Sequence, residues 1–243
     1  MTRALFDQFS KQYLKAFLSR WGQVTPNQEV PGEAKFIDIL FVPSSSPEAA
    51  PKSRPESLGL LGRFAATPCL LEPFRNPPSP EQVCSCLHKL FHVRADFQRR
   101  ANREKRTLAD ADLPRLWILA PSASQRLLSG FRLREDLQQW GAGLYLWGEF
   151  ERAAIVAINQ LPSVPETLWL RLLGRGTIQE RAIEEVLSLP QTSPLRANVL
   201  ELLTVWKINI AIPFEIGTVV RASRPREQDA RTTAFPKSFR IAI

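Results

Sequence analysis

The chain has 243 residues, 44% hydrophobic and 23% charged, and this balance excludes a globally disordered protein. No apolar run approaches the roughly 20 residues of a transmembrane helix, and the start of the chain lacks a signal-peptide core, so a cytoplasmic protein without a membrane partner is expected. The three cysteines are odd in number, which argues against a disulfide framework, and the net charge of +8 allows an anionic partner.

The first predicted elements are a helix over Ala4–Trp21, whose apolar residues recur at three- and four-residue steps, and a strand over Gln23–Val30. A second strand is predicted over Lys35–Val42. Both of its alternating faces are apolar apart from Asp38. This pattern predicts a strand covered on both sides, where an isolated carboxylate is costly.

The third predicted strand carries a second isolated carboxylate. It follows a Pro- and Ser-rich loop over residues 43–57 and occupies the run Thr67–Phe74, with Glu72 before Pro73. Proline has no N–H to give to a ladder, so the strand stops there or lies at an edge. Two acids on neighbouring strands can share a divalent cation, which makes Asp38 and Glu72 candidate metal ligands. The alternative is that each acid lies solvated at a strand end.

The rest of the core predicts further helices and strands. Ser79-Pro80-Glu81-Gln82 has the pattern of a capping box and begins a helix that reaches about Arg106. The later predicted elements are a strand over 116–119, a helix begun by a box of Ser122 and Gln125 and ended near Gly130, a strand over 143–147, a helix or strand over 150–161, helices over 165–173, 178–189 and 195–208, and one or two strands within 208–220.

These patterns divide the chain into an α/β core over residues 1–162, a helical appendage over 163–206, and a poorly specified tail over 207–243 for which disorder stays open. In the appendage, Ser163 and Thr177 begin capping boxes and Ser193 precedes a proline, so each is expected to cap a helix. Gly174-Arg-Gly176 predicts a turn between two helices, because it lacks the preceding strand and the Lys-Ser pair of a phosphate loop.

A cationic segment lies at the end of the helix predicted from Ser79. Between Arg94 and Arg106 six cations stand against two acids, a net charge of +4. Dense cations can contact phosphates without reading a sequence, although a solvated helix end has the same composition. The candidate nucleic-acid-binding residues are Arg94, Arg99, Arg100, Arg103, Lys105 and Arg106.

The order of one helix, three strands, a helix and a strand, with carboxylates in the second and third strands, resembles the core of the PD-(D/E)XK nuclease superfamily. Within it, the chain most resembles the bacterial Rpn family of recombination-promoting nucleases or transposases. The likeness spans roughly residues 4–206 and rests on Phe36-Ile-Asp38, on Cys69-Leu-Leu-Glu-Pro-Phe-Arg-Asn76 and on Leu168-Trp-Leu-Arg-Leu-Leu-Gly-Arg-Gly-Thr-Ile-Gln-Glu-Arg-Ala-Ile183. It implies an α/β, restriction-endonuclease-like αβββαβ core, with a central mixed sheet flanked by helices, and a C-terminal helical appendage.

The resemblance also implies that Asp38 and Glu72 hold Mg²⁺ and that the protein is an endonuclease hydrolysing phosphodiester bonds of DNA. The lysine of the family pattern belongs two residues after the acid, where this chain has Phe74. Arg75 or Lys35 is therefore expected to supply the displaced positive charge, and an arginine can stabilise negative charge but not act as a base. Two alternatives stay open: an inactive module of this fold that binds nucleic acid or a protein, and a structural protein that uses the appendage as an interface. A homodimer also stays open.

Overall fold

The computed structural model describes residues 3–30, 35–44 and 55–205, and within them the chain is an α/β protein built on one mixed sheet. Its strands are β1 (Gly22–Val30), β2 (Lys35–Pro43), β3 (Cys69–Pro73), β4 (Arg115–Ala120), β5 (Arg134–Glu135), β6 (Leu144–Leu146) and β7 (Ala153–Ala157). Its α-helices are α1 (Arg3–Leu18), α2 (Leu60–Phe64), α3 (Pro80–Arg103), α4 (Gln125–Gly130), α5 (Leu168–Arg171), α6 (Thr177–Ser188) and α7 (Pro194–Val205). Short 3₁₀ turns are η2 (Pro55–Leu58), η3 (Asp110–Asp112), η4 (Ile158–Gln160) and η5 (Pro165–Thr167).

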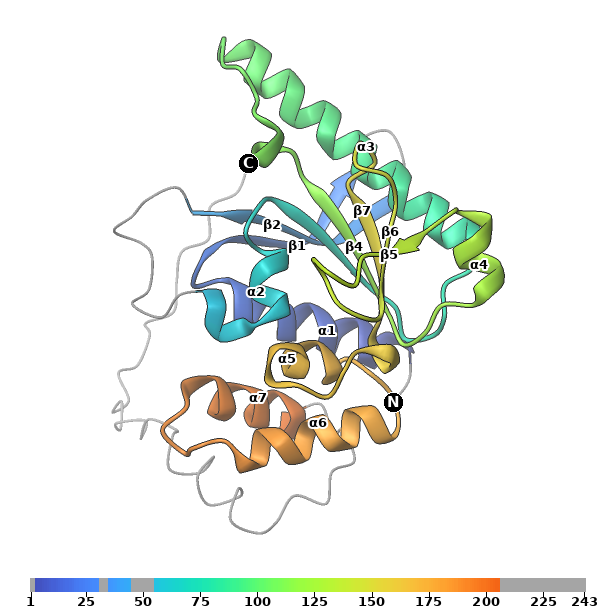
Figure 1. Ribbon diagram of the computed structural model, residues 1–243. Helices are drawn as coiled ribbons and strands as arrows, with labels where there is room; N and C mark the ends of the chain where they lie inside the picture. The colour runs from blue at the N-terminus through green and yellow to red at the C-terminus, as the bar shows by residue number, and fades with distance from the viewer. Residues whose placement is uncertain (1–2, 31–34, 45–54, 206–243) are drawn as a thin grey trace, which may run out of the picture. The chain divides into compact units, whose positions relative to one another are not determined.

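The strands lie in the order β1-β2-β3-β4-β7-β6-β5 (Figure 1). The central strands β3, β4 and β7 are parallel, and every other neighbouring pair is antiparallel. The stretch 150–161, which the sequence leaves undecided, forms β7 followed by η4. The two-residue strand β5 is too short to be recognised in the sequence. The predicted tail over 207–243, with the strands expected within 208–220, lies outside the described residues.

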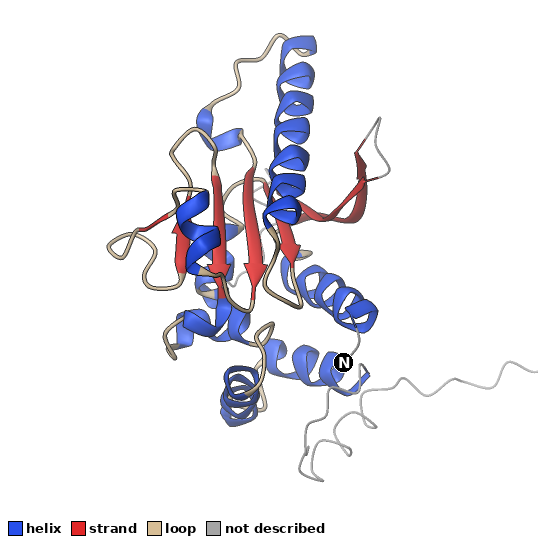
Figure 2. Ribbon diagram, turned by 90° about the vertical axis from the view of Figure 1, so that its right-hand side faces the viewer, coloured by secondary structure: helices blue, strands red, loops and turns tan. Residues whose placement is uncertain are grey.

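Helices pack on both faces of the sheet (Figures 1 and 2). On one face, α3 and α4 contribute to a buried cluster that includes Leu70, Val83, Leu90 and Leu116. On the other face, Phe64 of α2 stacks on Trp117 of β4 with ring centroids 3.8 Å apart. Among the described residues, no helix is both long enough and apolar enough to cross a membrane.

The expectation that β2 is covered on both sides is wrong. Ile37, Ile39 and Phe41 are fully buried, but Phe36 is 51% exposed and the Asp38 side chain keeps 22% of its exposure. The reason is the position of β2 in the sheet: it is second from the edge, and the described residues of its outer neighbour β1 are half-buried or exposed. Asp38 therefore lies at the border of the core and not deep inside it.

The predicted start of α3 is confirmed. Gln82 N donates to Ser79 Oγ at 3.3 Å, Ser79 N donates to Gln82 Oε1 at 2.9 Å, and Pro80 takes the first helical position. These two reciprocal bonds satisfy N–H groups that a helix start otherwise leaves without partners. The box fixes where α3 begins, and so fixes which of its side chains face β3.

Other predicted caps differ in detail. Gly176, and not Thr177, is the N-cap of α6, and no side chain caps that helix. Ser124, and not Ser122, caps α4 by accepting from Leu127 N at 3.2 Å. In both cases the cap is one or two residues from the predicted position, because several small or polar residues adjoin each helix start and the tertiary packing selects among them.

The segment predicted as a helical appendage packs against α1. The Tyr13 hydroxyl donates to Trp169 O at 2.6 Å, and the Phe17 and Trp169 rings lie 5.1 Å apart. The predicted helix over 165–173 is divided into η5 and the short α5, and Ser163 caps neither, because its hydroxyl donates to Glu185 Oε1 at 3.1 Å.

Candidate active site

Glu72 is a carboxylate almost fully enclosed by protein at the end of β3, with 1% of the residue exposed. Its Oε2 accepts a hydrogen bond from Lys89 Nζ at 2.7 Å, and Cys86 Sγ lies 3.9 Å from the same oxygen. Its Oε1 accepts from the backbone N–H of Asp38 at 3.3 Å. A buried carboxylate is stable only with such partners, so Glu72 is held in one place by two different elements, α3 and β2.

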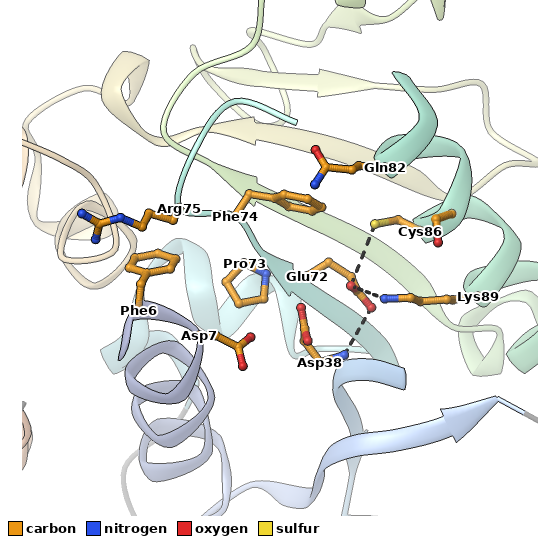
Figure 3. A pocket seen from close by; sticks show the side chains of 11 residues that line it. Phe6, Asp7, Asp38, Glu72, Pro73, Phe74, Arg75, Gln82, Cys86 and Lys89 are labelled. Carbon is orange, nitrogen blue, oxygen red and sulfur yellow. Dashed lines mark hydrogen bonds and ion pairs between the residues drawn. The ribbon is translucent and has the colours of Figure 1, made fainter. Parts of the chain in front are cut away.

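Asp38 reaches the same place from β2. The antiparallel register pairs Ile39 with Leu71, so Asp38 and Glu72 are the next opposed residues. The β2–β3 pairing ends at Ile39 and Leu71, and next to it the Asp38 N–H donates to the Glu72 side chain. Figure 3 shows the two carboxylates side by side in one pocket. The two acids singled out from the sequence therefore line one pocket, and their role as metal ligands stays a prediction.

A lysine from α1 holds Asp38. Lys11 Nζ lies 2.8 Å from Asp7 Oδ2, 2.8 Å from Asn27 Oδ1 and 3.0 Å from Asp38 Oδ1. These three acceptors can take all three N–H donors of the ammonium. Burial by itself would lower the pKa of Lys11, but the hydrogen bond to Asp7 and the charge of Asp38 outweigh it and raise that pKa.

Lys89 is the cation closest to Glu72, and sequence reasoning missed it. Burial by itself would lower the pKa of Lys89, but its contacts with Glu72 raise that pKa, so the ammonium stays charged. The spacing of residues in the sequence does indicate where Lys89 lies. Lys89 follows Cys86 by three residues and precedes Val93 by four, and both of those residues are buried. This spacing puts Lys89 on the inward flank of α3.

These side chains line a pocket of about 300 Å³ between α1, α3 and the end of β3 (Figure 3). The pocket contains both carboxylates, the Asp7 carboxylate and the Lys89 ammonium, with Phe74 and Phe6 as its apolar walls. It therefore combines charged groups of both signs with a cavity open to solvent, which is the combination that functional sites favour.

The structure does not show either cation proposed from the sequence, Arg75 or Lys35, in contact with the two carboxylates. Arg75 lines the pocket, but its side chain points away from Asp38 and Glu72 (Figure 3). The cause is Pro73: β3 ends at this residue, and the chain turns off the sheet after Phe74 N donates to Leu119 O at 2.7 Å. Lys35 begins β2, and its side chain lies outside what the structure describes.

The cationic segment lies at the far end of α3 and in the residues just after it. Arg99, Arg100, Arg103, Lys105 and Arg106 are exposed, whereas Arg94 is half-buried and donates to Phe150 O at 2.6 Å. At about 1.5 Å per residue, Arg103 lies roughly 21 Å along the helix from Lys89. The segment does not line the pocket, and Figure 1 shows this end of α3 extending beyond the strands.

The oxygen ligands of the pocket suit Mg²⁺. This ion prefers carboxylate oxygens and keeps several waters, so two carboxylates such as those of Asp38 and Glu72 would suffice as protein ligands. Within the described residues, no group of three His, Cys, Asp or Glu side chains is placed to hold a metal, which is the pattern a closed structural zinc site needs. A cation here would share the carboxylates with Lys11 and Lys89.

Burial, and to a smaller extent the charge of Asp38, raise the pKa of Glu72 to about 7 against the opposing effect of Lys89. In an unfolded chain this carboxyl titrates near 4.5. Between these two pH values the folded state keeps a proton that the unfolded state has lost. Glu72 therefore lowers the free energy of unfolding as pH rises from about 4.5 to about 7, by on the order of 3 kcal/mol.

Glu72→Gln is expected to abolish this contribution. Measured by urea denaturation at several pH values, the variant should gain stability relative to the wild type as pH rises through this window. Comparing the two proteins at each pH cancels the carboxylates that titrate in the opposite direction, such as Glu185, whose pKa is lowered by its hydrogen bond with Arg171. A difference that stays constant from pH 4.5 to 7.5 would show that Glu72 titrates normally.

Comparison with known proteins adds no assignment: no family model, no curated protein and no solved structure matches this chain.

Proposed function

We propose that this protein is a Mg²⁺-dependent DNA endonuclease of the PD-(D/E)XK type, with Asp38 and Glu72 as the metal ligands and Lys89 as the catalytic cation. The observation that supports this most strongly is the meeting of two carboxylates from adjacent strands with an ammonium 2.7 Å from Glu72. The order α1-β1-β2-β3-α3-β4 is compatible with the restriction-endonuclease-like core that the sequence resembles.

Lys89 takes the part that the sequence reasoning gave to Arg75 or Lys35. The family pattern places a lysine beside the acid on the same strand, and in this chain that position is the apolar Phe74. An ammonium is nevertheless beside Glu72, delivered from α3 across the pocket. Such a group would stabilise negative charge that develops on a phosphate bound there.

Each side chain has a distinct role in this proposal. When bound, Mg²⁺ would polarise the scissile phosphate and activate a water. Asp38 and Glu72 hold the cation, and Lys11 orients Asp38 through its contacts with Asp7 and Asn27. Because the pKa of Glu72 is about 7, cation binding near neutral pH would release a proton from it.

The charge distribution supports DNA as the substrate. The exposed cations at the end of α3, from Arg99 to Arg103, are roughly 15 to 21 Å from Lys89 along the helix. Phosphates on one strand of a duplex rise about 3.4 Å per nucleotide, so a bound duplex would reach from the pocket to this segment within several base pairs. These cations would then hold the DNA without reading its sequence.

The test is nicking of supercoiled plasmid by the purified full chain with Mg²⁺ or Mn²⁺, and with EDTA in parallel. Cleavage that requires the cation supports the proposal. Intact plasmid with both cations, under conditions where the folded protein binds the DNA, contradicts it.

A second function is favoured by one specific observation. Asp38 and Glu72 each already have a lysine partner, so neither depends on a metal ion for a counter-charge. A catalytically inactive module that binds nucleic acid through its cations has this same arrangement. Salt-dependent DNA binding without any cleavage would identify it.

A further inference from the structure

The turn between α5 and α6 reaches the loop that follows Glu72. Arg175 Nη1 donates to Asn76 Oδ1 at 2.8 Å and to the backbone oxygen of Arg75 at 3.5 Å. The sequence shows Gly174-Arg-Gly176 only as a connection between helices, and it is one. It also brings a second arginine beside Arg75, about a hundred residues away in the chain.

Arg175 is held in place from several sides. Its backbone N–H donates to Asn159 Oδ1 at 3.3 Å, and Gly176 adopts a φ of 57° that favours glycine. The two helices on either side of the turn are joined by the buried Arg171, which makes a two-pronged contact with Glu185 at 2.8 and 2.6 Å. An arginine fixed in this way loses little side-chain entropy when it binds an anion.

Arg75 and Arg175 place two guanidinium groups at the rim of the pocket, and neither is paired with a carboxylate of the described residues. Arg75 is half-buried and Arg175 is exposed, and neither forms an ion pair with any carboxylate in residues 3–30, 35–44 or 55–205. Arg75 points away from the carboxylates (Figure 3). Lys11 and Lys89, in contrast, are each bound to an acid.

We propose that Arg75 and Arg175 form a binding site for a DNA backbone phosphate that lies beside the scissile one. This rests on the proposed function. A guanidinium matches the oxygens of a phosphate with parallel N–H donors and stays charged at every working pH. Arg75 is three positions after Glu72 in the chain, at most about 10 Å of extended backbone. When one phosphate lies at the carboxylates, a neighbouring phosphate is therefore within reach of Arg75. Both arginines are positioning residues, because they contact the substrate away from the reacting bond.

The experiment measures binding of a fluorescent 20-base-pair duplex to the full chain in EDTA, over a series of salt concentrations. Arg75→Gln and Arg175→Gln should each weaken binding about tenfold at low salt, the loss expected for a hydrogen bond to a charged group. The slope of log affinity against log salt should fall by about 1 in the double variant. Arg175→Lys should keep the slope and lose part of the affinity.

The control is Arg20→Gln, which removes an equal charge beyond the other end of α1, roughly 20 Å from the pocket-lining Asp7. It should change affinity by less than twofold. Within the described residues the Arg75 side chain forms no hydrogen bond or ion pair that Arg75→Gln would remove, and circular dichroism checks the folding of both variants. Affinity and salt slope equal to those of the wild type in both arginine variants would overturn the phosphate site, as would a wild type that does not bind DNA.

Plasmid nicking is measured separately from DNA binding, so the nuclease proposal and the phosphate-site proposal can be rejected independently. A wild type that binds DNA but does not cleave it, with binding lost in Arg175→Gln, would keep the phosphate site and reject the nuclease. A wild type that cleaves DNA, with unchanged binding in both arginine variants, would keep the nuclease and reject the phosphate site. With an active enzyme, Arg175→Gln should raise KM more than it lowers kcat.

Discussion

Asp38→Asn and Glu72→Gln are each expected to reduce Mg²⁺-dependent plasmid nicking by at least about 100-fold. Each substitution keeps the size of the side chain and removes the negative charge that would bind the cation. Several kcal/mol of transition-state stabilisation depend on a catalytic metal, and each 1.4 kcal/mol corresponds to about tenfold in rate. The measurement is the initial rate of conversion of supercoiled to open-circular plasmid at saturating Mg²⁺.

Glu180→Gln is the matched control, because it removes one carboxylate from the exposed surface of α6, outside the pocket. It should nick at the wild-type rate. If nicking survives in both site variants, the assigned pocket is not the catalytic one. Thermal unfolding of each variant should accompany the assay, since a change in folding would also reduce the rate.

Lys89→Met is expected to destabilise the protein by about 3–5 kcal/mol at pH 8, the cost of removing one partner from a buried ion pair. The Lys89 and Glu72 side chains are only 12% and 2% exposed, so water replaces the lost ammonium poorly. At pH 5 the cost should be much smaller, because Glu72, with a pKa of about 7, is then already protonated. Urea denaturation at both pH values measures the difference.

The double variant Lys89→Met with Glu72→Gln completes this test. If the penalty at pH 8 comes from the unpaired carboxylate, the second substitution should recover about 2 kcal/mol or more. Lys15→Met is the control, since Lys15 is exposed on α1 and should change stability by less than about 0.5 kcal/mol. An equal penalty for Lys89→Met at pH 5 and pH 8 would mean that the lysine acts through packing alone.

The sequence was informative about the strands and the acids they carry. The apolar runs that became β2 and β3 were recognisable because each is short, continuous and interrupted by one carboxylate. Proline at position 73 correctly marked the end of β3. The register that sets Asp38 opposite Glu72 could not be read, because pairing between strands depends on contacts that lie far apart in the chain.

The cations of the pocket were harder to predict for a physical reason. Lys89 reaches Glu72 only because α3 crosses the sheet next to the end of β3, and a helix crossing is a tertiary property. Arg75 was expected from its distance along the chain, but Pro73 ends the strand and the side chain turns away (Figure 3). Lys11 and Arg175 come from helices and turns whose neighbours are fixed only in the folded protein.

The central claim, that Asp38 and Glu72 together hold a divalent cation, is tested most directly by counting Mn²⁺ bound to the full chain by electron paramagnetic resonance at pH 7.5. The account predicts one bound ion per chain in the wild type and in Glu180→Gln, and loss of that ion in Asp38→Asn and in Glu72→Gln. Equal Mn²⁺ binding by the wild type and both site variants would contradict it.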